Sequence, residues 1–422
     1  MIDASELKDS VENENDLVTK EIKTKSLKNI TPSFKNYREE YKHTPFIRRI
    51  EKKFSSFNPS SDIKNHEEYR ELIPDSEKYY IVIVNGSFLK QISSLPVEIE
   101  INNYKELTKE NREIFNSTYS KTDDSNFDIF STINSIQHQN CLTFRINKST
   151  ALDGKISIYN IVDSKNPVYF RKCFHIGKNS KVSFSEKFIY TSNESYFSNS
   201  VTEIFMDENS NLNYFTDQNI NKNYHYNSIN VFQKKDSISN FHTYSFSGAI
   251  IRNNLNIKLT EKNCYANMYG FYAIKNSSHI DNHTSVDHID ESSISNEHYK
   301  GIIDKDSNGV FNGKIYVRQK AQKTNAFQAN NNILLSDNAK VNTKPQLEIW
   351  ADDVKCSHGC TVGQLDEDAL FYLMSRGISR KDATSLLLSA FSADITDKIE
   401  DEDIRENYEL MILKELEELN HE

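Results

Sequence analysis

Three side chains that bind soft and borderline metal ions stand at alternate positions in "DDVKCSHGCTVGQLD", residues 352–366. They are Cys356, His358 and Cys360. Thiolate and imidazole are ligands that zinc, copper and iron prefer. If the segment is an extended strand, all three side chains leave the same face of a sheet, because side-chain direction repeats every two residues. The segment therefore predicts one strand that presents a row of metal donors.

A complete metal site on this strand alone is not expected. Successive donors in an extended strand are about 6.5 to 7 Å apart at Cα, which is far for one tetrahedral ion unless Gly359 bends the chain. Two donors completed by ligands from another chain would relieve this geometry, and a Cys and a His that are simply buried on a strand are the structural alternative. Asp352 and Asp353 point to opposite faces of an extended chain. We therefore expect them to cap or turn the strand and not to form an acid–base pair.

A second polar cluster lies in "HIDNHTSVDHIDESS", residues 279–293. Its candidate groups are His279, His283, Asp287, His288 and Asp290. His283 and Asp287 would be neighbours on a helix, but the Ser and Thr content predicts strand and turn. No G-x-S-x-G, H-E-x-x-H or C-x-x-C pattern supports a hydrolytic or metal site here.

Short β-type segments joined by Asn- and Ser-rich connections run from about residue 140 to 350 and must position these groups. Such strands could form a sandwich, a barrel or a stacked β-solenoid. With only 37% apolar residues, the solenoid fits best, because each coil needs one inward row and its neighbours complete a narrow core. No strict repeat motif is visible in the sequence.

Helical segments are predicted on both sides of this β region. Residues 1 to about 75 are charged and helix-like, with Pro32 and Pro45 preventing one uninterrupted helix. The pair Asn85-Gly86 after a β-branched run predicts a hairpin. Near the C-terminus, Asp366 is expected to cap a helix that Gly377 ends.

Two further helices are predicted after this one. The first starts at an S-x-x-D capping box, Ser379 to Asp382, and carries an expected apolar stripe of Ala383, Leu386, Leu387, Ala390 and Phe391. The second, about 403–419, carries Ile404, Tyr408, Met411 or Ile412, Leu416 and Leu419 on one side. We expect both stripes to make core or helix–helix contacts, with a docking groove for a partner as the alternative.

The composition argues against several classes of protein. Only 11 glycines are present, and neither G-x-G-x-x-G nor G-x-x-x-x-G-K-[ST] occurs, which argues against a nucleotide site built on a glycine-rich loop. The start of the chain has no basic segment followed by an apolar run, so we expect a cytoplasmic protein with no membrane segment. Five scattered cysteines predict reduced thiols and not a disulfide framework.

The net charge of −10 equals the charge of the C-terminal segment. Residues 366–422 contain 16 acidic and 6 basic residues, so the remainder of the chain is neutral. An acidic segment argues against nucleic acid as its partner and permits a basic protein surface. A solvated acidic helix face is the alternative.

The chain resembles the SufB/SufD family of iron–sulfur cluster assembly proteins. Residues 323–379, "KTNAFQANNNILLSDNAKVNTKPQLEIWADDVKCSHGCTVGQLDEDALFYLMSRGIS", resemble the family's C-terminal signature, and "KCSHG" with a following "TVG" is similar to the SufD branch. The similarity continues through "RKDATSLLLSAF". "EEYKHTPF", with Tyr41 where Trp is usual, and "VNGSFLKQISSLP" are weaker matches, and residues 105–260 match only in character.

This resemblance implies a mainly β fold, a right-handed parallel β-helix flanked by helical regions. We expect a helical region over 1–75, a β-helix core with a leading hairpin over 76–365, and a C-terminal helical domain over 366–422. The resemblance also implies a non-catalytic scaffold that pairs with SufB through the end of the β-helix. Its C-terminal helices would dock the SufC ATPase, so that ATP acts only through SufC.

The same resemblance assigns a role to part of the donor row. Cys356 and His358 match the family's Cys-x-His positions near the SufB interface, where iron or a transient nascent iron–sulfur cluster is thought to be held between the two chains. It does not establish Cys360 as a ligand. No nucleic acid or membrane partner is expected, and a homodimer is the alternative pairing when SufB is absent.

Two alternatives to the scaffold belong to other classes. One is an exported type of polysaccharide-active β-solenoid enzyme that would use the clustered acids Asp287, Asp290, Asp352 and Asp353. The other is a zinc-binding structural protein. Metal analysis of the chain expressed alone separates the second alternative from the scaffold, because half of a shared site should hold little zinc.

Overall fold

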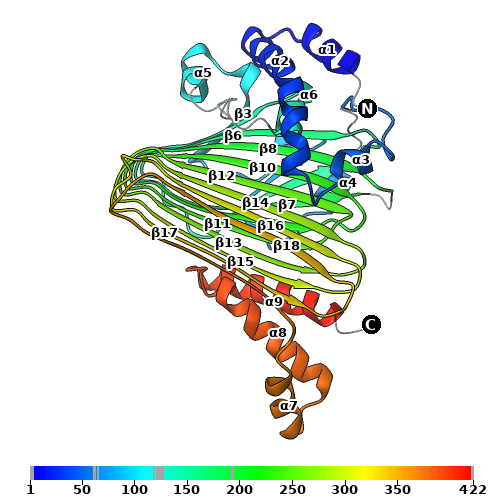
Figure 1. Ribbon diagram of the computed structural model, residues 1–422. Helices are drawn as coiled ribbons and strands as arrows, with labels where there is room; N and C mark the ends of the chain where they lie inside the picture. The colour runs from blue at the N-terminus through cyan, green and yellow to red at the C-terminus, as the bar shows by residue number, and fades with distance from the viewer. Residues whose placement is uncertain are drawn as a thin grey trace.

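Two parallel β-sheets stack face to face in the computed structural model and form a β-solenoid (Figure 1). The structure describes residues 4–59, 63, 66–116, 119, 128–191 and 194–419. From β5 onward, successive strands alternate between the sheets and each pairs in parallel with the strand two positions later. The predicted mainly β fold, a parallel β-helix with helices at both ends, is confirmed.

From β6 onward every strand has nine or ten residues, whereas the first five strands are shorter. Sheet A contains, in spatial order, β19 (Lys355–Gly363), β17 (Asn325–Leu334), β15 (Ile294–Ile303), β13 (Tyr265–Ile274), β11 (Ile238–Ser247), β9 (Asn211–Asn219), β7 (Lys181–Tyr190), β5 (Ile156–Val162), β1 (Tyr80–Val84) and β2 (Ser87–Phe88). Sheet B contains β18 (Lys340–Ile349), β16 (Asn308–Val317), β14 (His279–His288), β12 (Ile250–Leu259), β10 (Tyr224–Gln233), β8 (Phe197–Met206), β6 (Val168–Ile176), β4 (Leu142–Ile146) and β3 (Ile99–Asn103). The hairpin predicted at Asn85-Gly86 is confirmed, because β1 and β2 pair antiparallel across it.

One corner of most coils repeats a local structure that no sequence motif marks. A residue with positive φ recurs there every 27 to 31 residues, at Asn179, Asn209, Asp236, Asn263, Ser292 and Lys323. The next residue in each case is a buried Ser, Cys or Thr. At Ser210 and Ser237 its hydroxyl donates to a carbonyl three residues earlier, at 2.6 Å. Asn and Asp adopt left-handed φ more readily than other non-glycine residues, so the chain turns its corners with few glycines.

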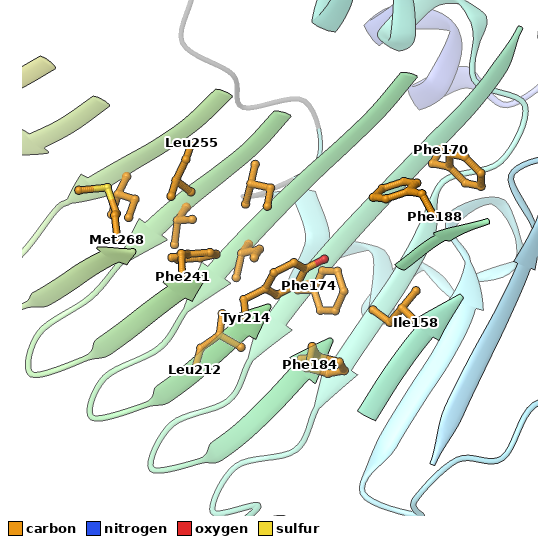
Figure 2. Packing of buried hydrophobic residues seen from close by; sticks show 14 of the residues in the cluster. Ile158, Phe170, Phe174, Phe184, Phe188, Leu212, Tyr214, Phe241, Leu255 and Met268 are labelled. Atoms are coloured by element: carbon orange, nitrogen blue, oxygen red, sulfur yellow. The ribbon is translucent and has the colours of Figure 1, made fainter. Parts of the chain in front are cut away.

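Apolar side chains fill the narrow space between the two sheets. Figure 2 shows part of this core, in which side chains such as Phe174, Phe184, Tyr214 and Phe241 lie side by side in the interior of successive coils. Phe144 and Phe174 are stacked at 4.1 Å between ring centroids. Each coil contributes a few inward residues and the neighbouring coils enclose them, which is how a chain of low apolar content forms a continuous core.

The helices that precede β5 are α1 (Ala4–Glu12), α2 (Leu17–Glu40), α3 (Phe46–Ile50), α4 (His66–Arg70), α5 (Lys109–Asn116) and α6 (Ile129–Gln137), with short 3-10 turns η1 (Lys90–Ile92) and η2 (Tyr104–Glu106). Most of them cover the outer face of sheet B, whereas α4 packs through Tyr69 on Val82 and Tyr159 of sheet A. Phe46 and Phe130 pack against Phe197 of β8. Pro32 lies inside α2 without ending it, whereas Pro45 is the N-cap of α3. The expected break at Pro32 is therefore wrong.

The C-terminal helices α7 (Glu367–Ser375), α8 (Arg380–Thr396) and α9 (Glu402–Leu419) lie at the outer face of sheet A, and α7 projects away from the solenoid (Figure 1). Asp366 caps α7, Ser379 caps α8, and Gly377 has φ +88°, as predicted. On α9 the predicted stripe is confirmed: Ile404, Tyr408, Ile412, Leu416 and Leu419 are buried.

The stripe predicted on α8 is wrong in part. Ala383 is buried, but Leu386 is 52% exposed and the buried apolar positions continue through Leu388, Ile395 and Ile399. Three consecutive leucines allow more than one stripe in the sequence, and packing on sheet A selects the face centred on Leu388. No helix in the described part of the chain is long and apolar enough to span a membrane.

Candidate functional site

The predicted donor row lies on β19, the last strand of sheet A, at the open end of the solenoid. Strand β19 pairs in parallel with β17, and the register places Cys356, His358 and Cys360 beside Ala326, Gln328 and Asn330. These three β17 residues are buried. The donors therefore continue the inward-facing row of the coil before them, and one more layer would be needed to enclose them.

The three donors have different surroundings. Cys356 is half-buried against the small apolar cluster that contains Ala326, and this burial raises the pKa of its thiol. His358 and Cys360 are exposed. The Cys360 sulfur lies 2.9 Å from the Thr343 hydroxyl oxygen of β18.

The row offers thiolate and imidazole ligands but does not surround an ion. Among the described residues, no group of three or more His, Cys, Asp or Glu side chains is arranged to hold a metal ion. Chemically, the strand presents soft donors on its inward row, with the side beyond the last coil left open. As arranged here, the described residues therefore provide only part of a coordination shell.

Strands β18 and β19 leave both sheets open at this end, since neither has a described strand on its outer side. An edge strand exposes unpaired backbone N–H and C=O groups that can pair with another chain. Val362 of β19 is 48% exposed, and Trp350, next to β18, stacks on Tyr316 with 6.5 Å between ring centroids. The open end therefore combines free backbone edges, exposed apolar side chains and the donor row.

The second polar cluster forms β14 and the following turn, as predicted. His288 points into the solenoid, where it is buried and lies 2.9 Å from the Ser295 hydroxyl oxygen. His279 lies 2.9 Å from the Thr44 hydroxyl oxygen on the other side of the strand. The structure thus distributes these histidines over two faces of sheet B and does not gather them into one site.

The acids of the polysaccharide-enzyme alternative are held in ion pairs or turns. Asp287 accepts two hydrogen bonds from Arg318, at 2.7 and 2.9 Å, and Asp290 accepts one from Lys320 at 2.8 Å. Asp352 and Asp353 lie in the turn before β19, as expected. A pair of opposed carboxylates for glycoside hydrolysis is not observed among these four residues.

A cavity of about 490 Å³ between α2, α6 and sheet B contains His283 and Asp287 in its wall. His283 and Lys314 both contact Glu40, and their hydrogen bonds and charges hold the pKa of that carboxyl well below its ordinary value. Glu40 and Lys314 therefore form an ion pair in the cavity wall, with the Lys314 nitrogen and the Glu40 oxygen 2.9 Å apart.

Sequence reasoning missed a polar column inside the last coils. Glu297 of β15 is buried and its carboxylate accepts a hydrogen bond from the Gln328 amide of β17 at 2.6 Å. Gln328 is in turn beside His358 in the register of β17 and β19. The sequence carries no clear signal for this pair, because Glu297 stands between the polar residues Asn296 and His298 and only the coil register brings it beside Gln328.

The C-terminal helices expose apolar side chains away from sheet A. Phe371 is 74% exposed on α7, and Tyr372, Leu386 and Leu410 are also exposed on α7, α8 and α9. An uncovered apolar surface of this kind is typical of protein interaction sites. Because α7 contacts chiefly α8, the solenoid does not bury its exposed side chains Phe371 and Tyr372.

Comparison with known proteins links this architecture to one family. The family model described as "SUF system FeS cluster assembly, SufBD core domain" matches residues 159–391. An iron–sulfur cluster assembly SufBD family protein of Synechocystis is 30% identical over 342 residues, 78% of this chain and 75% of that protein. SufD of Escherichia coli is 31% identical over 242 residues, 57% of each chain.

Protein ABCI7, chloroplastic, of Arabidopsis thaliana is 30% identical over 234 residues, 55% of this chain and 49% of that protein. The chain thus spans three quarters of the cyanobacterial relative and about half of the other two.

Proposed function

This chain belongs to the SufBD family of iron–sulfur cluster assembly proteins, and from that premise we propose that it is the SufD-type scaffold of a SUF assembly complex. It is a homologue of SufD. In the proposed role it performs no bond chemistry of its own and contributes ligands and binding surfaces to a complex with SufB and the SufC ATPase. Its five cysteines are free thiols, which suits a reducing compartment such as the cytoplasm.

The open end of the solenoid is the proposed SufB surface. A partner strand added to β18 or β19 would satisfy the edge backbone groups and cover Val362. The same contact would close the space in front of the donor row. A second copy of this chain could use these edges when SufB is absent, and size measurement of the isolated chain would detect it.

Cys356 and His358 are proposed as half of a site that holds iron or the nascent cluster, with SufB supplying the other ligands. The observation that carries this proposal is an inward-facing row of thiolate and imidazole donors at an unpaired sheet edge. A metal site shared between two chains needs soft donor side chains that remain accessible in each chain alone. Cys360, in contact with Thr343, is not assigned as a ligand.

The exposed apolar side chains of α7 and α8 are proposed as the SufC surface, with the acidic segment as its electrostatic complement. ATP would then act only through SufC, and closure of two SufC subunits would be transmitted through α7–α9 to the SufB contact. Because α8 and α9 pack directly on sheet A, a movement of these helices would displace the strands of that sheet, of which β19 is the last.

The test is cluster loading of the purified complex. Wild type and His358→Ala are co-expressed with SufB and SufC, purified together and reconstituted anaerobically with iron and sulfide. We expect His358→Ala to assemble normally and to hold less iron and sulfide per complex. His43→Ala, which removes an exposed histidine in the N-terminal region, is the matched control. Equal loading of wild type and His358→Ala would show the site assignment to be wrong.

A further inference from the structure

Glu297 is a buried carboxyl group that lacks the cationic partner its counterparts have. Glu186 pairs with Lys172, Glu203 with Arg171 at 2.5 Å, and Asp281 with Arg252 at 2.7 Å. Among the described residues, no basic side chain lies within ion-pair distance of Glu297. Its hydrogen-bond partners are both neutral, the Thr284 hydroxyl and the Gln328 amide. A buried, unpaired carboxyl group is costly, so its presence calls for a function.

The surroundings are shaped to hold this group beside Gln328. The Gln328 Nε2 atom donates to Glu297 Oε2 at 2.6 Å, and both residues are about 3% exposed. Gly313 of β16 faces them from the opposite sheet, and a Cβ atom there would collide with Gln328 Nε2 and lie 3.1 Å from Glu297 Oε2. Glycine at this position therefore leaves space for the Glu297–Gln328 pair.

The other end of the Gln328 amide is free. Its Oε1 atom is buried and has no hydrogen-bond partner among the described residues, although such an atom normally has one. The strand register stacks Glu297, Gln328 and His358 in three successive coils. An amide whose N–H₂ is held by Glu297 has its oxygen available to accept the ring N–H of His358.

Metal-binding histidines usually donate their second ring N–H to a carbonyl or carboxylate, which fixes the ring orientation and strengthens the ligand. We propose that Gln328 and Glu297 are positioning residues of the Cys356/His358 half-site: Gln328 orients His358, and Glu297 behind it provides negative charge that favours a bound cation. This inference rests on the proposed function, since it needs His358 to be a ligand.

The charge of Glu297 suits this role because it is adjustable. Burial is the main cause that raises its pKa to about 7, while the Thr284 and Gln328 hydrogen bonds act in the opposite direction. The carboxyl is therefore divided between its neutral and ionised forms near neutral pH. A cation held by His358 would favour the ionised form, and by linkage the ionised form favours the cation.

The test is a cobalt(II) titration of the full chain in its purified complex with SufB, followed by the visible absorption of the bound ion. The variants are His358→Ala, Glu297→Gln and Gln328→Met, the last two close in volume to the residues they replace. Asp217→Asn makes the same acid-to-amide change under α9, where Asp217 accepts from Tyr408, and serves as control. We expect Glu297→Gln and Gln328→Met to weaken cobalt binding about tenfold to a hundredfold, with Asp217→Asn unchanged.

A second readout separates positioning from simple support of the fold. If Glu297 serves the metal site, Glu297→Gln lowers the affinity for cobalt and leaves the protein equally stable or more stable. Loss of affinity together with loss of stability would overturn the inference, as would unchanged affinity in both column variants. If His358→Ala itself binds cobalt like wild type, the half-site proposal fails; if only His358→Ala weakens binding, the half-site stands and the column inference alone is wrong.

Discussion

Replacing Glu297 by Gln should change how stability depends on pH. In the folded protein the pKa of Glu297 is raised from 4.5 to about 7 by burial, whereas in the unfolded chain it returns to its ordinary value. The folded state therefore binds the proton more tightly, and its advantage is complete below pH 4.5 and is lost as the pH rises through 7. Gln carries no such proton, so the variant does not suffer this loss.

The size of the effect follows from the two pKa values. A shift from 4.5 to about 7 corresponds to about 3.5 kcal/mol at about 1.4 kcal/mol for each tenfold change, and about 2.5 kcal/mol of it falls between pH 5 and pH 8.5. The free energy of unfolding of Glu297→Gln, relative to wild type, should therefore increase by about 2.5 kcal/mol when the pH is raised across this interval.

Trp350 makes the measurement local. It is the single tryptophan of the chain and follows β18 at the end of the solenoid, stacked on Tyr316. Urea unfolding followed by its fluorescence at both pH values reports the coils around Glu297. Glu348→Gln, which changes an exposed carboxyl of β18, is the control. A difference between Glu297→Gln and wild type that stays constant with pH would refute the account of Glu297 as a buried, unpaired acid.

Four further changes test the surfaces and the column. Val362→Asp places a charge on the proposed SufB surface and should reduce co-purification with SufB by about tenfold or more. Unchanged co-purification would show that SufB binds at another surface. Phe371→Glu should abolish SufC pull-down while SufB stays bound. If the variant recovers as much SufC as wild type, α7 is not part of the SufC surface. Reversing the exposed acids in Glu406→Lys/Glu417→Lys should weaken SufC binding most at low salt, and a salt-independent result would contradict the electrostatic part. Gly313→Ala should displace Gln328 and weaken cobalt binding as Gln328→Met does, and unaltered binding would argue that the amide is not needed.

The β-solenoid could be predicted from the sequence because its requirements are local. Low apolar content, short strands and Asn-rich corners all favour stacked coils, and the helix ends followed from capping residues such as Asp366 and Ser379. The corner repeat is not visible in the sequence because four residue types, Asn, Asp, Ser and Lys, occupy the left-handed position. Only a shared φ, which the sequence letters do not show, identifies these corners as equivalent.

The candidate site was predictable only where its residues are adjacent in sequence. Cys356, His358 and Cys360 form a row on any extended strand. Gln328 is one coil and Glu297 two coils away from His358, so their relation depends on a register that alternation alone does not fix. Leu386 was misplaced for a related reason: the packing of α8 on sheet A, and not helix periodicity, decides which leucine is buried.

The most direct test of the central claim asks whether His358 is bound to the cluster when it is present. The chain is labelled with ¹⁵N only in its histidine rings, combined with unlabelled SufB and SufC, and reconstituted anaerobically. Pulsed electron paramagnetic resonance of the reduced cluster should then show a ¹⁵N coupling that is absent in His358→Ala and retained in His43→Ala. A loaded complex with no ¹⁵N coupling, or with a coupling that survives His358→Ala, would contradict the proposal that this chain provides half of the site.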